Sequence, residues 1–112
     1  MNISPSIIIV KQGDYGPDAT LAFTLTDPDN TITSLTGYTI TLLVWQDVTA
    51  PIINSVCVFD SGMTFHYVPT VNDFPAPGAA AQTYQYEIEF GKVGGRLSTV
   101  TGTLIIKPSP TH

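Results

Sequence analysis

This sequence of 112 residues is poor in cysteine and in charge, and above all in basic residues. Its one cysteine, Cys57, cannot form an internal disulfide, which excludes the class of small secreted domains held by disulfides and suits assembly in a reducing cytosol. Only four basic residues stand against nine acidic ones, and the net charge is −5. Because nucleic-acid binding depends on clustered Lys and Arg, we do not expect a nucleic-acid partner.

Long apolar runs and helical periodicity are lacking as well. No apolar run approaches the roughly 18 residues that a membrane helix needs, and Met1 to Pro5 lacks the basic and apolar regions of a signal peptide. We therefore expect a soluble chain with no membrane partner and no targeting signal. Nine prolines and nine glycines interrupt the chain so often that no window keeps a 3.6-residue apolar repeat.

The repeat that is present has a period of two, which is typical of half-buried strands. We expect strands at residues 7–11, 21–26, 38–45, 52–59, 63–67, 83–90 and 97–107. Segment 38–45 is apolar on both faces and suits a central strand. Asp60, Ser61 and Gly62 provide a hairpin turn between the fourth and fifth strands.

The clearest alternation lies in segment 83–90, where Tyr84, Tyr86, Ile88 and Phe90 share one face. The only long segment without a convincing strand is 69–82, which we predict to be a loop with a short helical turn at its end. Loops of this length are often functional. Residues Phe74, Pro75, Pro77 and Gly78 are therefore a candidate docking loop.

Seven short strands without helices predict an all-β fold, an immunoglobulin-like antiparallel β-sandwich in which every strand buries one face. A small β-barrel is the alternative, because the number of strands does not distinguish the two. The length suits one domain over residues 1–112, with short flexible ends at 1–5 and 108–112.

No pattern for catalysis emerges. His66 lies opposite Phe65 and Tyr67 in its expected strand, so we expect it to face solvent. Asp60 and Asp73 are near in sequence, but no Ser or Cys motif accompanies them. We therefore predict a protein that is not an enzyme and has no catalytic residue.

Cofactor and metal motifs are also missing. Residues 27–30, Asp-Pro-Asp-Asn, lack the spacing of a calcium-binding loop and read as a turn. Cys57 reads as a small buried hydrophobe, and Glu87 and Glu89 as an outward surface. The Gly94-Gly95 pair does not open a helix, so it is not a phosphate-binding loop. We predict no cofactor and no metal.

Two short motifs resemble the N-terminal immunoglobulin-like domain of phage baseplate upper proteins. The first motif consists of Lys11, Gln12, Gly13, Asp14 and Pro17, and the second of Leu35, Thr36 and Gly37. A Tyr-rich strand at 84–90 and the final strand at 104–107 complete the resemblance, which spans nearly the whole chain. It implies a virion protein in which this domain attaches a longer fibre-bearing protein to the tail baseplate.

No helical linker or receptor-binding region follows the last expected strand, so a neck, tail or capsid-surface position is nearly as credible as the baseplate. We expect a non-enzymatic virion module, assembled in the host cytoplasm in multiple symmetric copies, that docks to tail, baseplate, neck or capsid subunits. The alternatives are a capsid decoration protein and a small adhesion or glycan-binding module that uses Trp45 or Tyr15. The candidate docking elements are the extended N-terminal strand, the 69–82 loop, the 108–112 tail and the motif residues. Thr-rich, lysine-poor strand edges also invite pairing with a strand of a partner.

Overall fold

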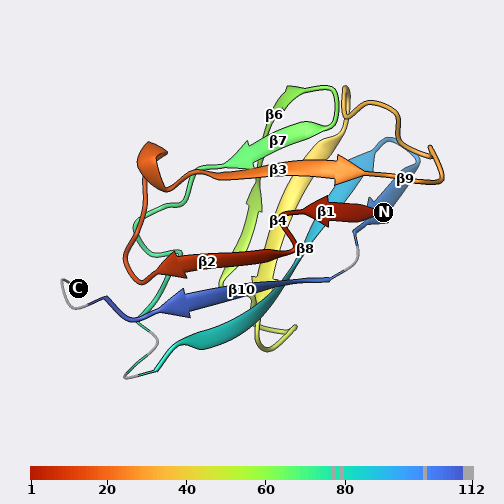
Figure 1. Ribbon diagram of the computed structural model, residues 1–112. Helices are drawn as coiled ribbons and strands as arrows, with labels where there is room; N and C mark the ends of the chain where they lie inside the picture. Colours follow the sequence, from red (N-terminus) through yellow and green to blue (C-terminus); the bar gives the residue numbers. More distant parts are fainter. Residues whose placement is uncertain (77, 79, 100, 110–112) are drawn as a thin grey trace.

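The computed structural model describes residues 1–76, 78, 80–99 and 101–109 (Figure 1). The described chain is almost entirely β-structure and contains one short 3-10 helix, η1 (Pro17–Ala19). The strands are β1 (Asn2–Ser4), β2 (Ile7–Lys11), β3 (Leu21–Thr26), β4 (Thr39–Trp45), β5 (Ile53–Val56), β6 (Val58–Ser61), β7 (Thr64–Tyr67), β8 (Gln82–Lys92), β9 (Gly95–Ser98) and β10 (Gly102–Lys107).

These strands form two sheets that pack face to face. One sheet has four strands in the order β1-β3-β7-β6, and the other has the order β2-β10-β8-β4-β5, with β9 also paired to β8. Among the described strands, all pairs are antiparallel except β2 and β10, which are parallel. The prediction of an all-β, immunoglobulin-like sandwich is confirmed, and the described strands do not close into the alternative barrel.

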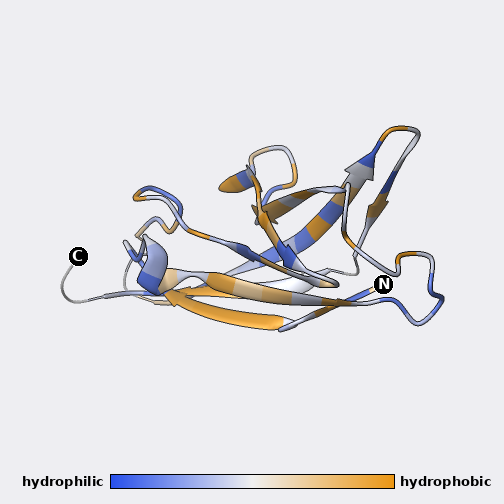
Figure 2. Ribbon diagram, turned by 90° about the horizontal axis from the view of Figure 1, so that it is seen from above, coloured by the Kyte–Doolittle hydropathy of each residue, from blue (hydrophilic) through white to orange (hydrophobic). Residues whose placement is uncertain are grey.

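The core lies between the sheets and is built from the alternating apolar residues, shown in orange in Figure 2. Phe23 and Phe65 stack with their ring centroids 5.2 Å apart, and Phe65 meets Phe90 of the other sheet edge-on at 5.7 Å. Tyr84, Tyr86, Ile88 and Phe90 are all buried, which confirms the predicted inner face of β8. Edge-to-face and offset ring pairs stabilise such a core beyond their buried area.

The N-terminal segment differs from the prediction. The sequence predicts a flexible end at 1–5, whereas Asn2–Ser4 form β1 and pair with β3. After a cis Ser4–Pro5 peptide bond the chain enters the other sheet as β2. The hydroxyl of the buried Tyr86 donates a hydrogen bond to the carbonyl oxygen of Pro5, so the crossing is tied to the middle of the sandwich.

Two predicted single strands are interrupted, so both predictions were wrong, and the interruptions differ in kind. Segment 52–59 divides into β5 and β6, which belong to different sheets, and the N–H of the intervening Cys57 donates to the carbonyl oxygen of Ile40 at 2.7 Å. Segment 97–107 divides into β9 and β10. Ser98 of β9 pairs with Glu89 of β8, and Gly102 of β10 pairs with Tyr86 of β8. Four residue steps on one side therefore lie opposite three steps on β8, which is the spacing of a β-bulge.

Candidate functional site

The candidate docking residues lie at two opposite ends of the sandwich. The motif end comprises residues 11–20, residues 69–76 and Lys107, and it includes η1 at the left of Figure 1. The hairpin end comprises residues 35–38 and the β6–β7 and β8–β9 hairpins. Because β8 begins beside the end of β10 and finishes beside the start of β4, the two groups are separated by the length of the sheet.

Backbone hydrogen bonds join the separate segments of the motif end. The N–H of Gln12 donates to Lys107 at 3.0 Å, that of Gly13 to Phe74 at 2.9 Å, and that of Gly16 to Pro69 at 2.9 Å. The first motif, the 69–82 loop and the end of β10 are therefore brought together. The sequence predicts docking elements at the first motif and in the 69–82 loop, but it contains no signal of their contact with each other or with the end of β10.

The turn of the first motif depends on two glycines. Gly13 has φ 77° and Gly16 has φ 88°, a backbone region that favours glycine. The N–H of Asp14 donates to the carbonyl oxygen of Lys11 at 3.2 Å, which closes the turn. An aspartate in a turn can bond nearby backbone N–H groups through its carboxylate, but within the described part of the chain the Asp14 carboxylate forms no hydrogen bond and is exposed.

The structure separates exposed from buried members of the predicted docking set. At the first motif, Lys11, Asp14 and Pro17 are exposed, whereas Gln12 is buried. In the candidate docking loop, Pro75 and Gly78 are exposed, and Pro77 lies outside the described residues. Phe74 is only 2% exposed and belongs to the core, so its assignment to the docking surface is corrected. We expect its burial to orient the loop.

The second motif lies at the other end of the molecule. Leu35 is buried in the core, and its N–H donates to the carbonyl oxygen of Gly62 in the β6–β7 turn at 2.9 Å. Thr36 and Gly37 are exposed. The two motifs therefore do not form one surface, because each closes a different end of the sandwich.

A buried aspartate organises the loop of the motif end. Asp73 accepts hydrogen bonds from the Thr70 N–H and hydroxyl, each at 2.9 Å, and from the hydroxyl of Tyr67. Burial, together with the Asp73 carboxylate, raises the pKa of Tyr67 to about 12. Asp73 therefore has a structural role and is not placed beside His66 as part of a catalytic pair.

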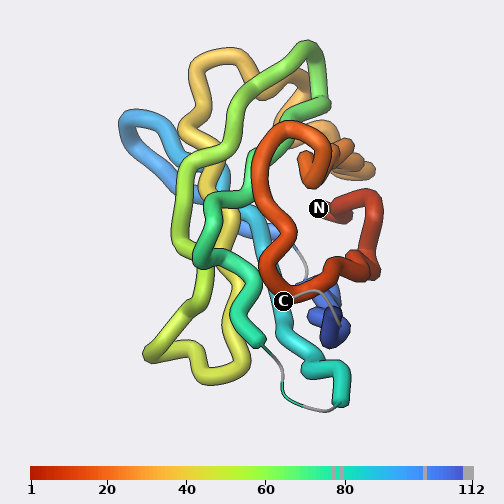
Figure 3. The backbone as a smooth tube through the Cα atoms, turned by 90° about the vertical axis from the view of Figure 1, so that its left-hand side faces the viewer, coloured from red at the N-terminus to blue at the C-terminus, as the bar shows by residue number. Residues whose placement is uncertain are grey.

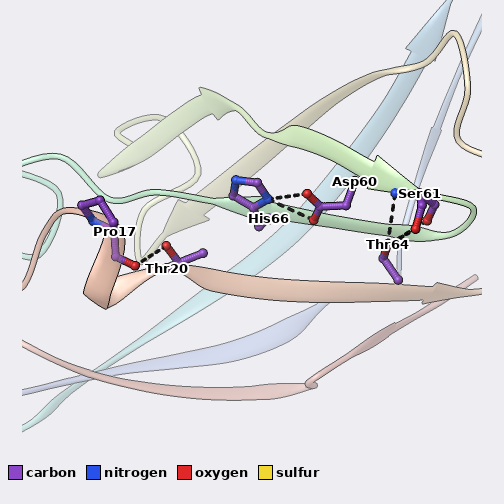
Figure 4. Close-up of polar contacts among 6 residues, drawn as sticks. All are labelled: Pro17, Thr20, Asp60, Ser61, Thr64 and His66. Carbon is purple, nitrogen blue, oxygen red and sulfur yellow. Dashed lines mark hydrogen bonds and ion pairs between the residues drawn. The ribbon is translucent and has the colours of Figure 1, made fainter.

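His66 has one feature of a catalytic base. Its Nδ1 lies 2.8 Å and 2.9 Å from the two carboxylate oxygens of Asp60, on the outer side of the β6–β7 hairpin (Figure 4). A catalytic triad also needs a nucleophile bonded to the imidazole. Among the described residues no Ser, Thr or Cys side chain is hydrogen-bonded to His66, and the nearby Thr64 hydroxyl donates to the Ser61 carbonyl oxygen.

The other candidate groups have structural partners. Asp27 accepts from the N–H of Asp29 at 3.3 Å and of Ile32 at 2.8 Å, which is turn chemistry. Cys57 is a free buried cysteine, and burial raises its pKa to about 12, so its thiolate is disfavoured. In the described part of the chain, no cluster of three His, Cys, Asp or Glu residues could hold a metal ion.

The outer side of β2 is a surface that the periodicity alone does not identify. Its isoleucines Ile7 and Ile9 are 61% and 57% exposed, whereas Ile8 and Val10 fill the core. In the register of the sheet, Ile105 lies beside Ile9. Four consecutive β-branched residues predict a strand, but only the tertiary structure shows that Ile7 and Ile9 lie on the outer face of the sheet and that β2 is an edge strand.

The fold thus defines the class of protein as a small immunoglobulin-like β-sandwich. No protein-family model matches this sequence, and a search of curated proteins gives no significant match. The described residues include no helix of the length and apolar character needed to span a membrane. The resemblance to the phage baseplate domain therefore stays a prediction based on its motifs.

Proposed function

We propose that this protein is a non-enzymatic structural component of a phage virion. It would act as an immunoglobulin-like assembly module of the tail, baseplate or neck that docks to other virion proteins. The motifs at 11–17 and 35–37 support the virion setting. The observation that carries the docking function is the uncovered edge of the six-stranded sheet at β2.

An edge strand offers backbone N–H and C=O groups to a further strand. Residues 7–10 of β2 are all apolar, and the first charged residue of the strand is Lys11. The side chains of Ile7 and Ile9 are exposed on the outer face of the sheet. Exposed apolar edges of this kind usually carry charges or prolines that prevent pairing. We propose that an extended segment of another virion protein pairs with β2 and covers Ile7 and Ile9.

The test is incorporation into particles of the chain with Ile9→Lys, matched by Val48→Lys in an exposed loop. Both variants replace an exposed apolar residue by a charge, so we expect both to fold. Only Ile9→Lys should be lost from purified virions, measured by mass spectrometry of the particles. Equal incorporation of both variants would contradict docking through β2.

The position in the particle is tested separately by cryo-electron microscopy of virions that carry a labelled chain. Density at the tail, baseplate or neck is the expected result. Density on the head would instead favour a capsid decoration protein. Absence of the chain from particles, together with clear binding on a glycan array, would replace the virion proposal by an adhesion function.

A further inference from the structure

The β8–β9 hairpin, light blue at the left of Figure 3, carries a groove at its base. The groove has a volume of about 330 Å³, and its lining includes Tyr38, Phe90, Lys92, Val93, Arg96 and Leu97. This volume lies in the range of small-ligand pockets and can admit one aromatic side chain. Val93, at the tip of the hairpin, is fully exposed.

Two of the four basic residues of this acidic chain lie at the groove. The Nζ atom of Lys92 lies 4.5 Å from the ring centroid of Tyr38. Arg96 lies 3.5 Å from a Glu89 oxygen, but its side chain stays 69% exposed, so the pair is a weak surface contact. Both cations can therefore bind a carboxylate that enters from outside.

The motif end carries the complementary groups. Asp14, Tyr15, Asp18 and Ala19 line a hollow of about 270 Å³, and the Tyr15 side chain is 58% exposed. Neither carboxylate forms an ion pair within the described part of the chain. The basic residues of this end, Lys11 and Lys107, lie side by side on β2 and β10 and do not line the hollow.

We propose that the groove of the hairpin end binds the Asp14–Asp18 corner of a second copy of this chain. Tyr15 of one copy enters the groove beside Tyr38, while Asp14 and Asp18 face Lys92 and Arg96. The exposed Val93 meets the hollow next to Tyr15. Each side of the contact thus combines an apolar or aromatic side chain with charges opposite to those of the other side. Elsewhere on the chain, the net charge of −5 disfavours self-association.

The contact joins different surfaces, so it is head-to-tail. The molecule measures 43 × 27 × 22 Å, and the two surfaces lie at its opposite ends. A head-to-tail contact repeats from copy to copy and yields a ring or a filament. This inference rests on the proposed assembly function, in which many copies of the chain lie together in one particle. It adds how two neighbouring copies contact each other.

The test is the mass of the isolated chain by analytical ultracentrifugation up to about 1 mM protein. We expect masses above the monomer that fall as salt is raised, because exposed ion pairs are screened. K92E with R96E, and separately D14K with D18K, should each weaken association at least about tenfold. Mixing these two double variants should restore head-to-tail association, because the unaltered corner of one meets the unaltered groove of the other and the two reversed surfaces are again opposite in charge.

The matched control is K11E with K107E, which makes the same change of charge outside the groove and should retain association. A monomeric unmodified chain at about 1 mM would overturn the proposal, and so would association that persists in K92E with R96E. Circular dichroism identifies a variant that does not fold, and in that case the salt dependence of the unmodified chain decides. If the isolated chain does not self-associate but Ile9→Lys alone is lost from virions, the β2 proposal stands without this one. If the chain self-associates but Ile9→Lys is incorporated normally, self-association stands and docking through β2 does not.

Discussion

The two ends of the sandwich are built differently. At the motif end, three backbone hydrogen bonds join segments that are far apart in the sequence, and Asp73 connects its loop to Tyr67. At the hairpin end, β9 pairs only with the neighbouring β8, and Lys92 and Arg96 form exposed contacts. Long-range backbone bonds therefore join three segments at the motif end, whereas at the hairpin end the Leu35–Gly62 bond joins the 35–38 turn to the β6–β7 hairpin and the β8–β9 hairpin presents its side chains from local pairing.

The largest effect should come from the strand that connects the two ends. A Cβ atom at Gly102 of β10 would lie 2.4 Å from Tyr86 Cε1 and 2.9 Å from the Ser6 carbonyl oxygen. Gly102→Ala should therefore lower the free energy of unfolding by about 3 kcal/mol, because the backbone oxygen cannot move freely. Chemical denaturation measures this, with Gly95→Ala, where the space is open, as the control. Equal stabilities would contradict the packing described.

The next effect tests the motif end. Asp73→Ala leaves the Tyr67 hydroxyl and the Thr70 N–H without their acceptor, so we expect a loss of about 2 kcal/mol in denaturation. Asp73→Asn keeps one acceptor oxygen and should lose less. If Asp73→Ala lowers the free energy of unfolding less than Asp73→Asn does, then this carboxylate does not hold the loop.

The corresponding change next to the hairpin end is Asp27→Ala, in the turn that follows β3 beside the β6–β7 hairpin. Asp27 accepts only local backbone N–H groups, from Asp29 and Ile32, so its removal should cost about 1 kcal/mol. Chemical denaturation of both variants shows which substitution lowers the free energy of unfolding more. If Asp27→Ala proves more costly than Asp73→Ala, then the hairpin end is the more firmly held and the comparison is reversed.

A smaller, pH-dependent effect should appear in alkaline solution. Burial raises the pKa of Tyr67 and Tyr86 from 10.0 to about 12. The folded chain then holds more protons than the unfolded chain between these values, so stability is full below pH 10 and falls as the pH rises to about 12. Thermal unfolding measured across this range should show the fall, and Tyr67→Phe should reduce it. An unchanged slope in the variant would exclude Tyr67 as a cause.

The smallest effect is expected at the hairpin contact itself. Arg96→Ala removes an exposed ion pair to Glu89 and should change the free energy of unfolding by less than about 0.5 kcal/mol. Thermal denaturation of the monomer at low concentration measures it. A much larger loss would mean that Arg96 serves the fold and is not free to bind a partner.

Local patterns predicted the elements whose residues are neighbours in the chain. The alternation in β8, the hairpin at 60–62 and the glycines of the first motif are all present in the structure. The division of 52–59 was missed because Cys57 continues the apolar composition while its N–H turns to Ile40. The Asp60 carboxylate beside His66 was noticed in the sequence, but the bond between them needed the register of the hairpin.

The sequence by itself determined which faces of the alternating strands enter the core, because a strand places alternate residues on opposite faces and burial of the apolar ones stabilises the fold. The loop residue Phe74 follows no such alternation, and its burial came from the tertiary structure. The tertiary structure alone decided which strands became edges and which loops met. Ile7 and Ile9 are exposed because pairing of β2 with β10 turns them to the outer face of the sheet, and Lys92 reaches Tyr38 because β4 pairs with β8. Both outcomes depend on hydrogen bonds between residues far apart in the chain, and a local pattern does not record them.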